Sequence, residues 1–314
     1  MHGALRNVLR LRVEIRPDGP LLVKAGGFAL DPTLPDMSFV RARLADGREA
    51  PYLPGSSLKG VVRGFVEQTL RGWGGGAPAG WRWACPVFPD HPESCAARLG
   101  DPRLSASEVY RRSCGACRMF GHTRLRGRVA FTDAYPKEEI ALEVRYGVAI
   151  SRRTQAGYNP FELEVAVGGA FAGWIILENF ELWQAALLAH ALAAMNEGMV
   201  RVGYGKTRGL GKVRLQVEEA VLDVAGAISN PREWPGVAGL VGPEIRKAYG
   251  LDPLQALEVP RDPDEQRAEG FLARRIWRGH KAKAWEAIAQ ALIREALRPE
   301  GGEHGGRGLA MGRG

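Results

Sequence analysis

Residues 51–63 read PYLPGSSLKGVVR, a proline-glycine turn that runs directly into an apolar helical pattern. Because serine is a favourable N-cap, we expect a helix that begins at Ser56 or Ser57. Apolar residues recur at helical spacing on one face, while Lys59 and Arg63 lie four residues apart on the other face. Free amides, hydroxyls and a lysine at a helix N-terminus are suited to phosphate binding, although an ordinary capped helix has the same features.

The segments around this helix follow the order strand, helix, strand, strand, helix, strand. Residues 8–15 alternate apolar with polar or charged side chains, which indicates a half-buried strand. This order is typical of the ferredoxin-like α+β fold, which we expect over residues 1–224. Further strands are expected at 128–132, 171–180 and 213–224, and an Ala/Leu-rich helix, apolar on nearly all sides, is expected at 183–195.

Two insertions and an extension are added to this order. Residues 72–118 are rich in Gly, Pro, Trp and Cys and lack a period, which indicates an insertion held by something other than a core. Residues 137–165 predict an extended β-hairpin with a polar tip at 152–160. Residues 225–314 add Pro-rich linkers, a helix over 281–297 and a Gly-rich end that we expect to be disordered.

The four cysteines all lie in or beside the first insertion. Cys114 and Cys117 form a C-x-x-C knuckle, and Cys85 and Cys95 complete a four-sulfur set of the kind that structural zinc prefers. A metal there would supply the folding energy that the segment lacks. Free buried thiols and a redox pair are the competing interpretations, and His91 could replace Cys85 or Cys95 as a ligand.

The composition points to a globular protein with an anionic partner. Hydrophobic residues make up 45% and charged residues 25% of the 314 residues, which excludes a disordered chain. The formal net charge is +8, which favours nucleic acid as a partner. No apolar run is long enough for a membrane span and no signal-peptide core is visible, so we expect a cytoplasmic protein without a membrane partner.

Two basic segments strengthen the case for RNA. Residues 201–214 contain five basic residues and four glycines without an acid, so the backbone can approach a phosphate chain that the cations neutralise. Residues 111–128 contain six arginines without an acid, and the predicted hairpin adds arginines and aromatic residues, a mixture that suits single-stranded RNA. The candidate RNA-binding residues are Ser56, Ser57, Lys59, Arg63, Arg118, Arg152, Arg153, Gly205, Lys206, Arg208 and Gly209.

With these pieces in order, the chain resembles the RAMP superfamily, the backbone subunits of type III CRISPR effector complexes. The matching pieces are PYLPGSSLKGVVR (51–63), CGACRMFG (114–121), RVAFTDAYP (128–136), GVAISRRTQAG (147–157) and GYGKTRGLGKVRL (203–215). The resemblance implies a modified ferredoxin-like core similar to the RNA-recognition motif, and spaced cysteines are typical of backbone subunits with a zinc knuckle. It also implies copies that stack along a CRISPR guide RNA together with other effector subunits.

The resemblance further implies roles for two segments. Residues 140–165 would be a hairpin thumb that flips one base at regular intervals out of the guide–target duplex. In target-cleaving members, a loop aspartate before the PGSSLKG motif cuts the target RNA beside each flipped base, and Asp36 best matches that position, with Asp31 and Asp46 as alternatives. Such a carboxylate could use Mg²⁺ or Mn²⁺ to help deprotonate a 2′-hydroxyl, or Asp36 could only cap a turn.

Three functions therefore stay open. The chain could be a guide-binding backbone subunit that cleaves target RNA through Asp36, or the same scaffold without nuclease activity, with cleavage left to a partner nuclease. It could also be a guide-RNA-processing endonuclease, an activity that usually needs a His/Tyr/Lys set for acid–base cleavage. The six histidines form no motif that resembles such a set.

Overall fold

The computed structural model describes residues 3–24, 35–73, 80–86, 88, 90–226, 230–279 and 283–297. Its main element is a seven-stranded sheet whose described pairings are all antiparallel, with the strand order β14-β15-β11-β1-β10-β6 and with β7 paired to β10. The strands are β1 (Asn7–Pro17), β6 (Val129–Phe131), β7 (Tyr135–Pro136), β10 (Phe171–Glu178), β11 (Val213–Ala225), β14 (Glu265–Glu269) and β15 (Leu272–Arg278).

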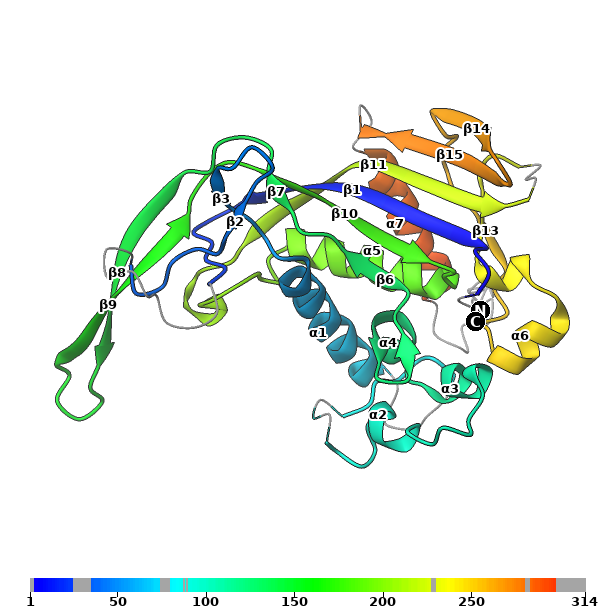
Figure 1. The fold of residues 1–314 in the computed structure, drawn as a ribbon, viewed down its shortest axis with the longest axis horizontal. Helices are drawn as coiled ribbons and strands as arrows, with labels where there is room; N and C mark the ends of the chain where they lie inside the picture. The colour runs from blue at the N-terminus through cyan, green and yellow to red at the C-terminus, as the bar shows by residue number, and fades with distance from the viewer. Residues whose placement is uncertain are drawn as a thin grey trace, which may run out of the picture.

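The four central strands and two helices have the ferredoxin-like arrangement. Strand β1 lies between β10 and β11, and β6 pairs with the far side of β10. Helix α1 (Gly55–Trp73) connects β1 to the β6 side of the sheet, and α5 (Leu182–Asn196) connects β10 to β11. Both helices lie beneath the sheet in Figure 1. The expected α+β, ferredoxin-like fold is therefore confirmed.

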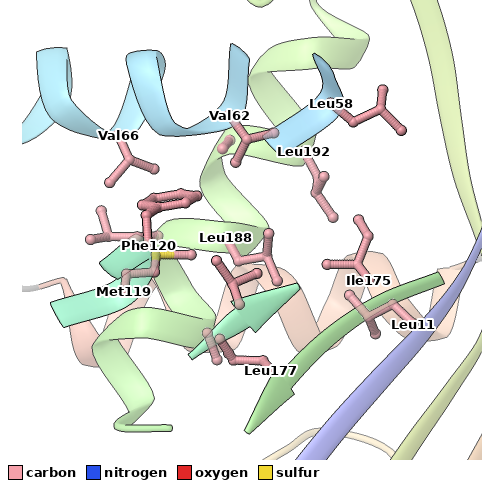
Figure 2. Close-up of a cluster of buried hydrophobic side chains, with 14 of the residues drawn as sticks. Leu11, Leu58, Val62, Val66, Met119, Phe120, Ile175, Leu177, Leu188 and Leu192 are labelled. Carbon is pink, nitrogen blue, oxygen red and sulfur yellow. The ribbon is translucent and has the colours of Figure 1, made fainter. Parts of the chain in front are cut away.

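The core between these layers follows from the alternation seen in the sequence. Alternate residues of β1 and β10, such as Leu11 and Ile175, point to the helices and are buried. Helix α1 meets them with its apolar face, on which Leu58, Val62 and Val66 lie four residues apart. Figure 2 shows these side chains packed in one cluster together with residues of α5.

Helix α5 is buried on nearly all sides because it has neighbours all round. It packs against α1, against β11 and against α7 (Lys283–Ala296), a helix expected at residues 281–297. This explains why its sequence is apolar without a polar face. Among the described residues, no helix combines the length and apolar character that are needed to cross a bilayer.

Helix α1 begins at Gly55, slightly earlier than the expected start at Ser56 or Ser57. Its first amide is satisfied by a distant residue, because Gly55 N donates to Asp133 Oδ1 at 2.8 Å. A side chain at Gly55 would collide with the backbone, since an added Cβ would lie 2.3 Å from Phe131 O. The PGSS turn is thus wedged against the end of β6, and both serines lie in the first turn of the helix.

Two hairpins leave the body of the molecule. The expected long hairpin is formed by β8 (Leu142–Ile150) and β9 (Gly157–Ala166), and it projects far from the sheet in Figure 1. A second, small hairpin of β2 (Arg41–Arg43) and β3 (Glu49–Pro51) lies near its base. No periodic pattern marks this second segment in the sequence, because its strands are only three residues long.

The cysteine-containing insertion folds into short helices and a two-stranded ladder. It packs on the main core as well as on itself, since Met119 and Phe120 lie beneath α1 in Figure 2. The ring of Trp81 also stacks on that of Trp183 in α5, with centroids 4.5 Å apart. The insertion is therefore not held by its cysteines alone. Its elements are α2 (Cys95–Arg98), α3 (Ala106–Arg112), α4 (Gly115–Phe120), β4 (Gly121–His122) and β5 (Leu125–Arg126).

The chain after residue 224 continues the sheet. Strand β15 pairs with β11, and β14 pairs with β15, so the sheet gains two strands that the sequence did not indicate. Asp252 reaches the insertion, where its carboxylate accepts from Trp81 Nε1 at 2.8 Å. The expected disorder of the Gly-rich end lies outside the described residues. The remaining elements are β12 (Glu233–Pro235), α6 (Pro243–Tyr249) and β13 (Ala256–Glu258).

Candidate metal centre and nucleic-acid interface

The four cysteine sulfurs come together in the insertion. Their Sγ atoms all lie within 4.8 Å of one another, and all four residues are buried. The sulfurs of Cys85 and Cys117 are 3.8 Å apart. Four thiolates bound at ~2.3 Å to one tetrahedral ion would lie about 3.8 Å apart, so the set fits a metal such as zinc. The set is complete without His91, whose Nδ1 accepts from Glu93 N.

Amide and guanidinium groups point at the sulfurs, whereas the sulfurs repel one another as thiolates. The amides of Cys114 and Cys117 point at sulfur atoms, at 3.3 Å from Cys95 Sγ and 3.4 Å from Cys114 Sγ. Arg63 Nη2 lies 3.9 Å from Cys117 Sγ. The neighbouring sulfurs of Cys114, Cys85 and Cys95, followed by burial, raise the pKa of the Cys117 thiol. Four thiolates can therefore coexist here only around a cation.

A groove forms where the start of α1 meets the glycine-rich loop. It has a volume of about 720 Å³, and Ser57 lines one wall and Lys206 the other. The loop is tied back to the strand end at residues 20–22, because Tyr204 N donates to Leu22 O at 2.7 Å and Gly211 N donates to Pro20 O at 2.9 Å. These bonds hold the loop beside residues 20–24, and the groove lies between this loop and the start of α1, a motif about 150 residues earlier in the chain.

Glycine is required at the point where the loop folds back. Gly203 has a φ of +80°, and a Cβ there would lie 2.1 Å from Leu22 O. Gly205 and Gly209, with φ of +67° and +87°, flank the short 3₁₀ turn of residues 206–208. The glycines therefore shape a turn that presents Lys206 and Arg208 to solvent.

The cations that line the groove are free of carboxylates in the described part of the chain. Many basic side chains elsewhere are ion-paired, as Asp223 shows by pairing with both Arg10 and Arg274. Within the described residues, the three cations that line the groove have no carboxylate partner, and no acidic residue lines it. A buried or paired cation gains little from an anion, whereas unpaired cations in a groove attract a polyanion. The three are Lys24, Arg201 and Lys206.

The other expected RNA-binding residues divide into two groups. Ser56 and Lys59 adjoin the groove in the first turns of α1, and burial followed by the charge of Arg63 lowers the pKa of Lys59. Arg208 lies over the ring of Tyr204, with its Cζ 4.9 Å from the centroid. Arg152 and Arg153 are exposed at the tip of the β8–β9 hairpin, which projects away from α1 in Figure 1.

Arg63 and Arg118 face the insertion instead. Arg63 donates to Glu67 Oε1 at 2.8 Å and to the carbonyl of Gly121. Arg118 is 2% exposed, and its guanidinium donates to backbone carbonyls that include Ser113 O and Arg111 O. Its charge fixes the fold of the insertion, so Arg118 is left out of the RNA-binding surface proposed below.

Lys24 and Gln68 line the groove but were not singled out in the sequence. Lys24 precedes a segment without a period, and Gln68 lies on the polar side of the α1 pattern. No local sequence pattern marks either residue as a binding residue, because only the tertiary fold brings them to the glycine-rich loop.

Asp36 contacts strand β9 of the long hairpin. Its carboxylate is exposed, and Oδ2 accepts from Glu162 N of β9 at 2.9 Å. Val40, four residues later, donates its amide to Val23 O. Of the alternative aspartates, Asp46 pairs with Arg48 and Asp31 lies outside the described residues.

Glu164 fixes this segment to the hairpin. Its carboxylate accepts from Phe39 N at 2.9 Å and binds the Arg41 guanidinium at 2.6 and 2.8 Å. Burial alone would raise the pKa of Glu164, but the hydrogen bonds from Arg41 and Phe39 lower it. The ionised Glu164 thus holds the Asp36 segment at a defined place.

The described histidines do not meet the requirements of a processing nuclease. His91 is bound to Glu93 N in the insertion, and His122 Nε2 lies 3.0 Å from Ser113 Oγ. His190 contacts the ring of Phe65 from α5. These three lie in separate parts of the described chain, and none lines the groove.

A comparison with protein-family models matches residues 14–214 to the RAMP superfamily. The matched region is more than half of the chain and includes the end of β1, α1, the insertion, the long hairpin and the glycine-rich loop. A search of curated proteins found no match.

Proposed function

The chain belongs to the RAMP superfamily, and from this membership we propose that it is a guide-RNA-binding backbone subunit of a type III CRISPR effector complex. The family supports a CRISPR-associated RNA-binding role in general. The proposal adds the type of complex, in which further copies of the chain and other effector subunits share one guide, and complementary target RNA pairs with that guide.

The observation that carries the proposal is the groove between α1 and the glycine-rich loop. It joins a helix N-terminus, which attracts anions, to glycine backbone and three unpaired cations. A phosphate chain makes such contacts without regard to base sequence, as a guide with variable spacers requires. The proposed phosphate-binding residues are Ser56, Ser57, Lys59, Gly205, Lys206, Arg208 and Gly209.

The β8–β9 hairpin supports the role of a thumb. It projects beyond the body and exposes Tyr146 and Tyr158, which are 79% and 58% accessible. Exposed aromatic residues next to Arg152 and Arg153 suit contact with bases and phosphates. We propose that this hairpin inserts into the guide–target duplex.

We further propose that Asp36 cleaves the target. Among the described residues, Asp36 belongs to no group of three or more potential metal ligands. In the proposed step the Asp36 carboxylate accepts the proton of a 2′-hydroxyl, and that oxygen bonds to the adjacent phosphorus. The bond from phosphorus to the 5′ oxygen breaks, and this oxygen takes a proton from water. The products are a 2′,3′-cyclic phosphate and a 5′-hydroxyl.

A non-catalytic scaffold is the second candidate function. The observation that favours it is the hydrogen bond from Glu162 N to Asp36, because a carboxylate that only fixes a loop would make the same contact. In that case cleavage belongs to a partner nuclease, while the RNA-binding groove keeps its role.

The metal of the cysteine centre is proposed to be zinc. Four sulfur ligands without an open position are typical of a structural site rather than a catalytic one. Zinc would hold α2 and α4 beside Arg63 and thereby support the helix that forms one wall of the groove.

The Lys206→Ala variant tests the RNA-binding surface. We expect its affinity for single-stranded RNA to fall about three- to tenfold and equally for all sequences, because Lys206 contacts phosphate. The slope of log affinity against log salt should decrease by about one. Both quantities are measured by fluorescence anisotropy titrations at several salt concentrations.

Lys247→Ala is the matched control. Lys247 is also exposed and has no carboxylate partner in the described chain, but it lies on α6 at the opposite end of the molecule from the long hairpin. Equal effects of the two variants, or no effect of Lys206→Ala at physiological salt, would place RNA somewhere other than this groove.

A further inference from the structure

The groove extends along α1 well beyond the place where a phosphate would bind. Ser57, Gly60, Gly64 and Gln68 lie on one face of the helix, three or four residues apart, and all of them line the groove. From Ser57 to Gln68 the helix rises by about 16 Å. This length exceeds what a single phosphate group needs.

The far part of the groove is apolar. Val61 and Phe65 of α1 line it, and the opposite wall is formed by Met199 and Val200, of which Met199 is 60% exposed. The ring of Phe65 is supported from behind by His190, with centroids 5.3 Å apart. Phosphates gain no binding energy from an apolar surface, whereas nucleobases can stack on it with their faces.

The two glycines leave this surface open. Neither Gly60 nor Gly64 has any atom within 4 Å of the place where a Cβ would be. Larger side chains at these positions would fill the groove from the α1 side. The Gln68 amide, with both donor and acceptor groups, lies at its end and can pair with the edge of a base.

We propose that this part of the groove binds the bases of single-stranded RNA, with the phosphates on Lys24, Arg201 and Lys206. The proposal rests on the guide-binding function, and it names bases as well as phosphates as the bound groups. Charge complementarity selects RNA over a protein segment, because the described lining has three unpaired cations and no acid. The volume of about 720 Å³ is of the size that accepts small planar groups rather than a duplex.

The test compares two RNA probes of equal charge, a mixed-sequence single strand and the same backbone with its bases removed. Wild-type protein should bind the intact strand at least about fivefold more tightly, because stacking on Phe65 and Met199 is lost without bases. In Gly64→Leu this ratio should fall close to one. The salt dependence of binding should stay unchanged, because every cation is retained.

Gly72→Leu is the matched control, since Gly72 is on the same helix, is equally free of neighbours and does not line the groove. It should keep the wild-type ratio. Thermal unfolding shows whether each variant is folded, and Gly60→Leu serves as a second variant that fills the groove.

Each result decides the inference. Equal binding of both probes by wild type, or an unchanged ratio in the two groove variants, overturns it while guide binding stands. If the groove variants lose multi-copy assembly on a long guide but keep the wild-type ratio of affinities for the two probes, the groove binds a neighbouring copy of the chain. That result also overturns the inference. Failure of wild type to bind either probe would contradict the proposed function itself.

Discussion

Asp36→Ala is expected to abolish target cleavage in an assembled complex while guide and target binding stay almost unchanged. A positioned general base contributes about 10²- to 10⁴-fold to rate, so at least a hundredfold loss is expected. Binding should survive because the duplex is held by phosphate contacts, which a negative charge would oppose. The measurement is cleavage of an end-labelled complementary RNA in magnesium buffer, resolved at single-nucleotide resolution.

Asp46→Ala provides the control for this variant. Asp46 is an aspartate of the same region whose carboxylate is paired with Arg48, so cutting at regular intervals should persist. If Asp36→Ala kept the wild-type pattern, the role would pass to Asp31 or Asp46. A complete wild-type complex that does not cut would favour the scaffold function.

Cys114→Ser is expected to lose the metal and to destabilise the protein by roughly 3–5 kcal/mol, because a structural metal contributes directly to folding. Serine can still cap α4, as the Cys114 side chain does by accepting from Cys117 N. The measured loss of stability would therefore result from the absence of the metal rather than from the absence of the helix cap. Denaturant unfolding with and without a chelator measures the loss, and elemental analysis should find one zinc per wild-type chain.

Ser113→Ala separates metal loss from a general packing defect. Ser113 is buried beside the centre, where its hydroxyl donates to Val109 O, and it is not a ligand. This variant should keep its zinc and lose only about 1 kcal/mol. Folded wild-type protein without zinc, or with unfolding unaffected by chelator, would contradict the metal assignment.

The parts of the fold that were predictable are those that local pattern determines. The period of two in β1 and the period of 3.6 in α1 each follow from the side chains of one segment. Strands β14 and β15 were missed because each of their sequences, EQRAE and LARRIWR, contains three charged residues and no regular alternation of apolar side chains. In the folded protein those charges form ion pairs such as Arg278 with Glu265, which no local pattern reveals.

The candidate site was predictable where its residues are close in sequence or chemically restricted. The cysteine set could be recognised because thiols with knuckle spacing are rare. The PGSSLKG turn could be recognised because it combines a helix start with polar side chains. The position of Lys24 in the groove and the hydrogen bond from Gly55 N to Asp133 could not be predicted, because both depend on contacts between segments that are far apart in the chain. For Arg118 the sequence was misleading. It lies in a basic segment that suggested RNA binding, but in the fold its guanidinium is buried and donates to carbonyl groups.

The most direct test of the central claim is to sequence the RNA that purifies with the protein from cells that carry a CRISPR locus. The proposed function predicts RNAs with CRISPR repeat sequence joined to many different spacers, recovered in lower yield from Lys206→Ala than from Lys247→Ala. Recovery of RNA without repeat-derived sequence, or of no RNA from assembled protein, would contradict it.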